Sequence, residues 1–179
     1  MTGNSATRLK LRPHPASPGV APIEISATVA RPSPGVLTLD YTVTGTLNDL
    51  LIPAPAEPSR TDGLWRHTCF EAFVRFGAGE GYAEFNFSPS GDWAAYGFSG
   101  YREGMTPLDI GAPAIEVRYD GGGLELKVRL ELTSALSAGA RLGLSAVIED
   151  RGGGLSYWAL AHPATQPDFH HRGGFVYER

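Results

Sequence analysis

Acidic and amide side chains alternate with aromatic ones between Gly63 and Tyr101, a stretch that holds 11 of the 18 aromatic residues of the chain. Glu71, Glu84 and Asn86 each stand between apolar neighbours, so each projects from one face of a predicted strand. Carboxylate and amide groups beside aromatic rings can bind the hydroxyl groups of a ligand that stacks on those rings. The same alternation is also typical of an ordinary sandwich core with a solvated outer side.

Trp65, Arg66 and His67 form a triplet in the loop that we expect before the first of these strands. The indole can stack on a sugar or another planar ligand while the two basic side chains donate hydrogen bonds to it. Equally, Trp65 can cover one end of the core while Arg66 and His67 form local pairs. The triplet is therefore a candidate binding rim with a structural alternative.

Paired residues on adjacent strands share a face, which limits how the strands after Cys69 and after Tyr82 can align. This rule predicts that Phe76 lies opposite Ala83, and Arg75 then lies opposite Glu84. An ion pair between Arg75 and Glu84 explains the carboxylate without a ligand.

The turn from Ser88 to Gly91 has proline and glycine where a type I turn favours them. Its exact length decides the position of Trp93. A two-residue loop sets Trp93 beside Asn86 on the polar face, whereas a three-residue loop sets it beside Phe87 in the core. Alternation leaves both positions open.

Two further groups of side chains have types that could support chemistry. Glu71 and Glu84 project from neighbouring strands, and two such carboxylates can hydrolyse a glycosidic bond, although a partner such as Arg75 would lower the pKa of Glu84. Near the end of the chain, His162, His170, His171 and Asp168 could bind a metal or transfer protons. Adjacent histidines point to opposite faces of an extended segment, so the pattern favours a locally bonded loop and predicts no metal site.

Composition excludes several classes of protein. Fifteen basic against 19 acidic residues give a net charge of -4 with no basic stripe, so we expect no nucleic-acid partner. No apolar run approaches the roughly 18 residues of a membrane-spanning helix, and no signal-peptide pattern follows Met1. Cys69 is the single cysteine, which excludes an intrachain disulfide and suggests a reducing, cytoplasmic location.

Short apolar runs separated by glycine and proline predict an all-β fold: a two-sheet antiparallel β-sandwich of jelly-roll type. We expect a flexible N-terminus over residues 1–7, a single domain over 8–179, and single turns at Leu47–Leu51 and Thr133–Ala138. The predicted strands are Arg8–Arg12, Ile23–Ala30, Gly35–Thr44, Cys69–Phe76, Tyr82–Ser88, Asp92–Ser99, Ala114–Asp120, Leu124–Leu132, Leu142–Asp150 and Leu155–Leu160.

Three runs carry a resemblance to a known family: DGLWRHTCFEAFV, YAEFNFSPSGDWAAYGF and SYWALAHPATQPDFHHR. They resemble bacterial DOMON-like proteins, which are related to family 9 carbohydrate-binding modules and to haem- or sugar-binding DOMON domains. The resemblance implies a jelly-roll-like sandwich with a ligand site on one sheet face. For haem-binding relatives it implies an axial methionine with a histidine or lysine, for which Met105 and His162 are the nearest residues.

The sequence therefore predicts a non-enzymatic module that binds a small carbohydrate-like ligand, with no required cofactor. The alternatives are a haem-binding domain, a glycoside hydrolase that uses Glu71 and Glu84, and a structural or protein-interaction sandwich, for which association into a homodimer is expected to be feasible. The predicted ligand-binding residues are Trp65, Arg66, His67, Glu71, Asn86, Trp93, His162 and His170.

Overall fold

The computed structural model describes residues 6–17, 21–120, 122–133 and 141–178. Their regular structure consists of β-strands and two 3-10 turns, η1 (Leu64–Arg66) and η2 (Arg172–Gly174), and none of these described residues forms a helix long and apolar enough to cross a membrane. The strands are β1 (Thr7–Pro13), β2 (Ile23–Ala30), β3 (Val36–Gly45), β4 (Cys69–Arg75), β5 (Tyr82–Phe87), β6 (Trp93–Phe98), β7 (Thr106–Pro107), β8 (Ala114–Tyr119), β9 (Gly123–Glu131), β10 (Arg141–Glu149), β11 (Leu155–Ala159) and β12 (Tyr177–Glu178).

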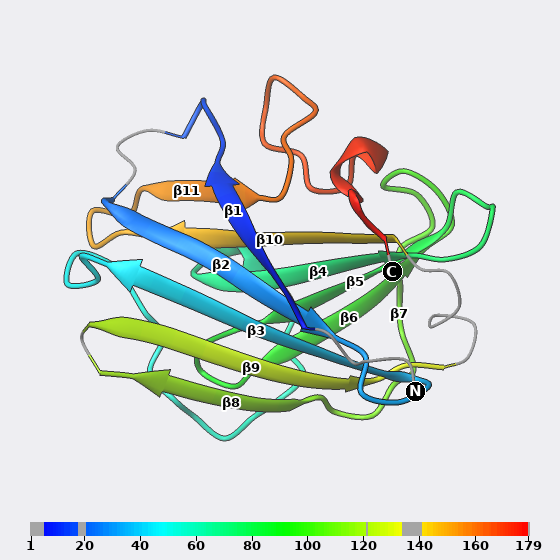
Figure 1. Cartoon of the computed structure of the whole chain (residues 1–179), viewed down its shortest axis with the longest axis horizontal. Helices are drawn as coiled ribbons and strands as arrows, with labels where there is room; N and C mark the ends of the chain where they lie inside the picture. The colour runs from blue at the N-terminus through cyan, green and yellow to red at the C-terminus, as the bar shows by residue number, and fades with distance from the viewer. Residues whose placement is uncertain (1–5, 18–20, 121, 134–140, 179) are drawn as a thin grey trace.

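The strands form two antiparallel layers that share β1, and Figure 1 shows β2, β3, β9 and β8 lying over β4, β5 and β6. The first sheet has the order β8-β9-β3-β2-β1, and the second continues as β1-β11-β10-β4-β5-β6-β7, with β12 on β10. Residues 7–11 of β1 pair with β2, whereas Arg12 and Pro13 pair with β11. This architecture confirms the predicted antiparallel β-sandwich.

The main core lies between the two sheets. In β9, Leu124, Leu126, Val128 and Leu130 are at most 2% exposed, while the residues between them face solvent, as the alternation predicts. Burying one face of each sheet removes a large apolar area from water and stabilises the sandwich.

The second sheet is buried on its outer face as well, contrary to the solvated side that one interpretation of the sequence offers. Phe73, Tyr82, Tyr96, Phe98 and Phe175 form a second apolar cluster there. The segment after β11 folds back over this face, as Figure 1 shows for the orange and red part of the chain. The polar residues of β4 and β5 are therefore enclosed.

All ten predicted strands are confirmed, with ends displaced by at most one residue. β7 and β12 have two residues each, too few to show a period in the sequence. The turn at Leu47–Leu51 is confirmed by a bond of 3.0 Å from the Leu50 amide to the Leu47 carbonyl oxygen. β1 begins at Thr7, inside the expected flexible segment; residues 1–5 and most of Thr133–Ala138 lie outside the described residues.

The predicted register between β4 and β5 is wrong by two residues. Arg75 lies opposite Tyr82 rather than Glu84, and its guanidinium group donates to the carbonyl oxygen of Gly79. Alternation cannot separate these registers, because residues two apart share a face. The six-residue loop over 76–81 determines the register, and Glu84 has no arginine partner on β4.

Trp93 lies in the core, which settles its two predicted positions in favour of packing. It is opposite Phe87 and 7% exposed, and the Arg60 guanidinium carbon lies 5.0 Å from the centroid of its ring. The predicted turn is present, since the Gly91 amide donates to the carbonyl oxygen of Ser88 at 3.0 Å.

Candidate functional site

The floor of the site is the enclosed outer face of the second sheet, at the middle of β4, β5 and β6. Glu71 projects from β4 and Glu84 from β5, because core residues take the alternate positions. Glu71 lies opposite Asn86. Glu84 lies opposite Tyr96 of β6. Two carboxyl groups that are separated in the sequence by a hairpin thus share one patch.

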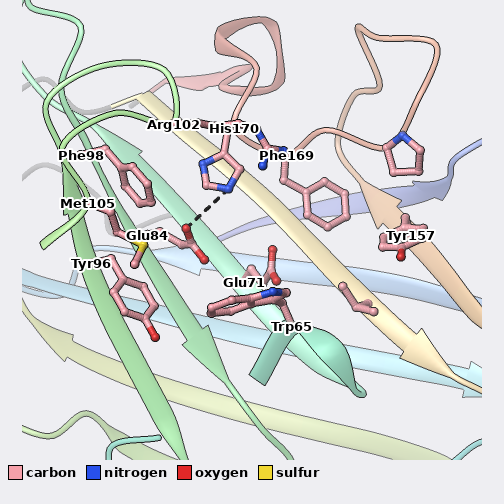
Figure 2. A pocket seen from close by; sticks show the side chains of 12 residues that line it. Trp65, Glu71, Glu84, Tyr96, Phe98, Arg102, Met105, Tyr157, Phe169 and His170 are labelled. Carbon is pink, nitrogen blue, oxygen red and sulfur yellow. Dashed lines mark ion pairs between the residues drawn. The ribbon is translucent and has the colours of Figure 1, made fainter. Parts of the chain in front are cut away.

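Segments around this floor form the walls of a half-open cavity of about 380 Å³ (Figure 2). The walls come from η1, from the loop that follows β6, from β10 and β11, and from the segment after β11. The lining residues are Trp65, Glu71, Glu84, Tyr96, Phe98, Arg102, Met105, Val147, Tyr157, Pro167, Phe169 and His170. Aromatic surface with a few convergent polar groups is the usual character of a small-ligand site.

Trp65 stands at the edge of the cavity because η1 holds it there. Gly63 begins the turn with φ of 80°, a conformation that favours glycine, and its carbonyl oxygen accepts from the Arg66 amide at 3.1 Å. The indole is 37% exposed and meets the ring of Tyr96 edge-on, with 6.1 Å between centroids. One side of the indole is thus fixed, and part of its surface is open to a ligand.

Asn86 orients Glu84 from below. Its side-chain nitrogen donates to Glu84 Oε1 at 2.7 Å, and Asn86 itself is fully buried. The other oxygen, Oε2, lies 3.7 Å from His170 Nε2, the contact drawn as a dashed line in Figure 2. Glu84 therefore directs one oxygen at the sheet and the other at the cavity.

Tyr82 fixes the tautomer of His170. The Tyr82 hydroxyl oxygen accepts from the Arg102 amide at 3.2 Å and lies 2.7 Å from His170 Nδ1. The hydroxyl hydrogen is then available to Nδ1, which leaves the ring proton on Nε2, toward Glu84. Burial, followed by the nearby charge of Arg102, lowers the pKa of His170 to about 4, so the ring is neutral near pH 7.

Burial raises the pKa of both carboxyl groups. Glu71 is 2% exposed and lies close to Glu84, whose charge raises its pKa further, while the hydroxyl group of Ser145 donates to Oε2 at 3.2 Å. For Glu84, burial outweighs the hydrogen bond from Asn86 and the charge of Arg102. The expectation that an arginine lowers the pKa of Glu84 through a cross-strand pair is therefore wrong.

Arg102 is tied to the opposite wall. Its Nη2 donates to Asp168 Oδ1 at 2.9 Å, and the Tyr101 hydroxyl group donates to Oδ2 of the same carboxylate at 2.6 Å. Burial raises the pKa of Asp168, but the hydrogen bonds from Tyr101 and Arg102 outweigh it, and the pKa is lowered. This network joins the loop after β6 to the C-terminal segment and holds the mouth of the cavity.

Three of the eight predicted ligand-binding residues line the cavity, namely Trp65, Glu71 and His170. Asn86 lies beneath it, where it supports Glu84. Trp93 faces the opposite side of the sheet. The cavity thus contains part of the predicted set.

The other predicted residues lie elsewhere. Arg66 is exposed outside the cavity lining, and His67 Nδ1 bonds Glu149 Oε2 at 2.8 Å. His162 Nε2 lies 2.7 Å from the carbonyl oxygen of Arg12, and its ring contacts that of His14. Local pairing, the structural alternative for such residues, therefore describes the surroundings of His67 and His162.

Several lining residues escaped the sequence reasoning. Tyr96 and Phe98 alternate with the core residues of β6 and could have been assigned to the polar face once the position of Trp93 was known. Tyr157 belongs to β11, whose place beside β10 the sequence does not indicate. Arg102 and Phe169 come from segments outside the strands, and no local pattern in the sequence marks them.

The two residues that the resemblance implies as axial haem ligands are not brought together, because Met105 lines the cavity whereas His162 does not. Among the described residues, no group of three or more histidine, cysteine, aspartate and glutamate side chains is arranged to hold a metal ion.

No protein-family model and no curated protein matches the sequence. Among solved structures, the chain is similar to a protein from Bacteroides uniformis that is provisionally named carbohydrate-binding, with a TM-score of 0.68 and 17% identity over 96% of this chain and 84% of that one. The likeness establishes the fold. The chain also shows a weaker likeness to a family 9 carbohydrate-binding module from Caldicellulosiruptor kristjanssonii. The structure of that module with cellotriose bound has a TM-score of 0.48 and 12% identity, over 85% of this chain and 72% of that chain. Its structure with glucose bound has a TM-score of 0.48 and 11% identity, over 85% of this chain and 74% of that chain.

Proposed function

We propose that this protein is a non-enzymatic module that binds a small carbohydrate-like ligand in the cavity over β4, β5 and β6. The observation that carries the proposal is the pairing of a partly open indole, Trp65, with buried carboxyl groups on the cavity floor. A pyranose has apolar C–H faces that stack on aromatic rings and hydroxyl groups that bond carboxylates. The fold likeness to a protein provisionally named carbohydrate-binding supports the same proposal.

The side chains have distinct roles in this proposal. Trp65 is the stacking platform, and Tyr96 supports it from the side. Glu71 and Glu84 accept hydrogen bonds from ligand hydroxyl groups, and His170 donates one from Nε2. Each of these groups lines the cavity.

Fluorescence titration against a panel of mono- and oligosaccharides tests the proposal. Trp93 and Trp158 are 7% and 3% exposed, so a ligand that quenches tryptophan emission acts through Trp65. We expect Trp65→Ala to abolish the quenching and to weaken binding, measured by calorimetry, by about tenfold or more. Tyr119→Ala, which removes an exposed aromatic side chain from the other sheet, should bind as the wild type does. Absence of any saccharide ligand, or unchanged affinity in Trp65→Ala, contradicts the proposal.

Glycoside hydrolysis is the second candidate, because Glu71 and Glu84 both line the cavity and both have a raised pKa. A coupled pair of this kind can hold one proton between its two members, as acid catalysis requires. Release of nitrophenol from aryl glycosides distinguishes the two candidates. A binding module gives no turnover, whereas a hydrolase gives turnover that Glu71→Gln or Glu84→Gln removes.

A further inference from the structure

The carboxyl groups on the cavity floor have acceptor atoms that their neighbours do not use. Ser145 donates to Oε2 of Glu71, and among the described residues no donor reaches its Oε1. For Glu84, Oε1 accepts from Asn86, but the 3.7 Å from Oε2 to His170 Nε2 is too long for a hydrogen bond. Each of these side chains is more than nine-tenths buried and lines the cavity, so a free oxygen of each is available to a ligand in the cavity.

The basic side chains near these oxygens are either paired with another carboxylate or uncharged near pH 7. Arg102 is the only permanent cation among the described lining residues, and it is paired with Asp168 at 2.9 Å. His170 is uncharged near pH 7, with its Nδ1 occupied by Tyr82. When both glutamates are ionised, the lining carries two carboxylates, and its one guanidinium group is already paired with Asp168, so the cavity has an excess of negative charge.

Aromatic rings surround this excess of acceptors. Trp65, Tyr96 and Phe98 line the cavity together with Glu71 and Glu84, and Figure 2 shows these rings around the two carboxyl groups. An ammonium group is attracted both by carboxylates and by the faces of aromatic rings. A neutral hydroxyl group offers neither of these charge-dependent interactions.

We propose that the cavity selects an amino sugar, whose ammonium group binds between Glu71 and Glu84 while its pyranose ring packs on Trp65. This inference rests on the proposed function and narrows its ligand class. The ammonium group supplies three donors for the free oxygens and a second positive charge beside that of Arg102, which is already paired with Asp168. A neutral sugar of the same shape satisfies the hydrogen bonds but leaves the charge uncompensated.

Binding of the ammonium group is coupled to proton release. Burial raises the pKa of both glutamates, and an ammonium group bound beside them favours their ionised forms, so binding releases protons wherever these carboxyl groups are protonated in the free protein. Affinity for an amino sugar therefore increases with pH as long as the amine stays charged. The other ionisable groups that interact with these two carboxyl groups are Tyr41, Cys69, Tyr82, Tyr96, Arg102 and His170.

Calorimetry with three matched pairs of sugars tests the inference: glucosamine and glucose, galactosamine and galactose, mannosamine and mannose. We expect one amino sugar to bind at least about tenfold more tightly than its parent near pH 6.5, where a primary amine beside a polar group is charged. The heat of binding should depend on the ionisation enthalpy of the buffer for the amino sugar and not for the parent. N-acetylation of the amine should remove the preference.

Isosteric variants locate the effect. Glu71→Gln and Glu84→Gln should reduce the preference for the amine to about threefold or less and abolish proton release, while a parent sugar still binds. Glu125→Gln, an exposed glutamate of the other sheet, is the matched control and should keep the wild-type preference. A parent sugar that binds as tightly as its amine overturns this inference and leaves the proposed function standing. Binding of none of the six sugars overturns this inference as well, and the panel of mono- and oligosaccharides then decides separately whether the proposed function stands.

Discussion

Replacing Phe73 by alanine measures how much the outer face of the second sheet contributes to stability. Phe73 is 1% exposed, and its ring centroid lies 5.2 Å from that of His170 and 6.1–6.5 Å from those of Tyr82, Phe169 and Phe175. Truncation of a buried phenylalanine costs about 3–5 kcal/mol, which includes the cavity left behind. We expect Phe73→Ala to lower the free energy of unfolding by that amount in urea titrations followed by tryptophan fluorescence.

Phe70→Ala is the matched control, because Phe70 is on the same strand and fully buried in the core between the sheets. If the outer face is a second core, the two variants lose similar free energy. A loss below about 1 kcal/mol for Phe73→Ala beside a large loss for Phe70→Ala refutes the reasoning, since exposed positions cost that little. Phe73→Leu, expected to cost about 1–1.5 kcal/mol, decides the question if the alanine variant does not fold.

Three further changes follow from the groups around the cavity. Burial raises the pKa of Glu71, so the folded protein keeps a proton that the unfolded chain releases above about pH 4.5. The free energy of unfolding should therefore decrease as the pH rises above that value. Glu71→Gln should make this decrease smaller, which urea titrations at several pH values can measure. An NMR titration should find the His170 ring neutral until the pH approaches about 4, and a midpoint near 6.5 would contradict its burial. Tyr82→Phe removes the bonds to His170 and to the Arg102 amide and should cost about 1–2 kcal/mol in the same urea assay; an unchanged midpoint would show that they contribute nothing.

The sequence predicted the strands and their faces because each carries a period of two over several residues. Leu124–Leu132 shows this most clearly, and its apolar residues are all buried. The register of β4 on β5 could not be predicted, since a slip of two residues preserves every face. That error paired Glu84 with Arg75, which lies opposite Tyr82, and so predicted a lowered rather than a raised pKa for Glu84.

The cavity itself was predicted only in part. Trp65, Glu71 and His170 were identified by residue type and position. Arg102 and Phe169 lie in segments without periodicity, and they reach the cavity through long-range contacts such as that between Arg102 and Asp168, 66 residues apart. A single sequence has no signal for such contacts, because they depend on how the whole chain folds back over the sheet.

β1 sets a condition on when this protein can finish folding. It precedes every other described strand, and its two partners are β2, which follows it directly, and β11, near the end of the chain. Just beyond β1, the His14 side chain bonds the carbonyl oxygen of Ala164, 150 residues away. During translation, the ribosome must therefore add about 150 residues after β1 before β1 can pair with β11 and join the two sheets. Contacts of such high sequence separation make folding slow, and the nascent first sheet keeps an open edge and an uncovered apolar face in the meantime. We therefore expect nascent chains to engage chaperones until β10 and β11 emerge, and the cavity over β4, β5 and β6 to form only after synthesis of the C-terminal segment.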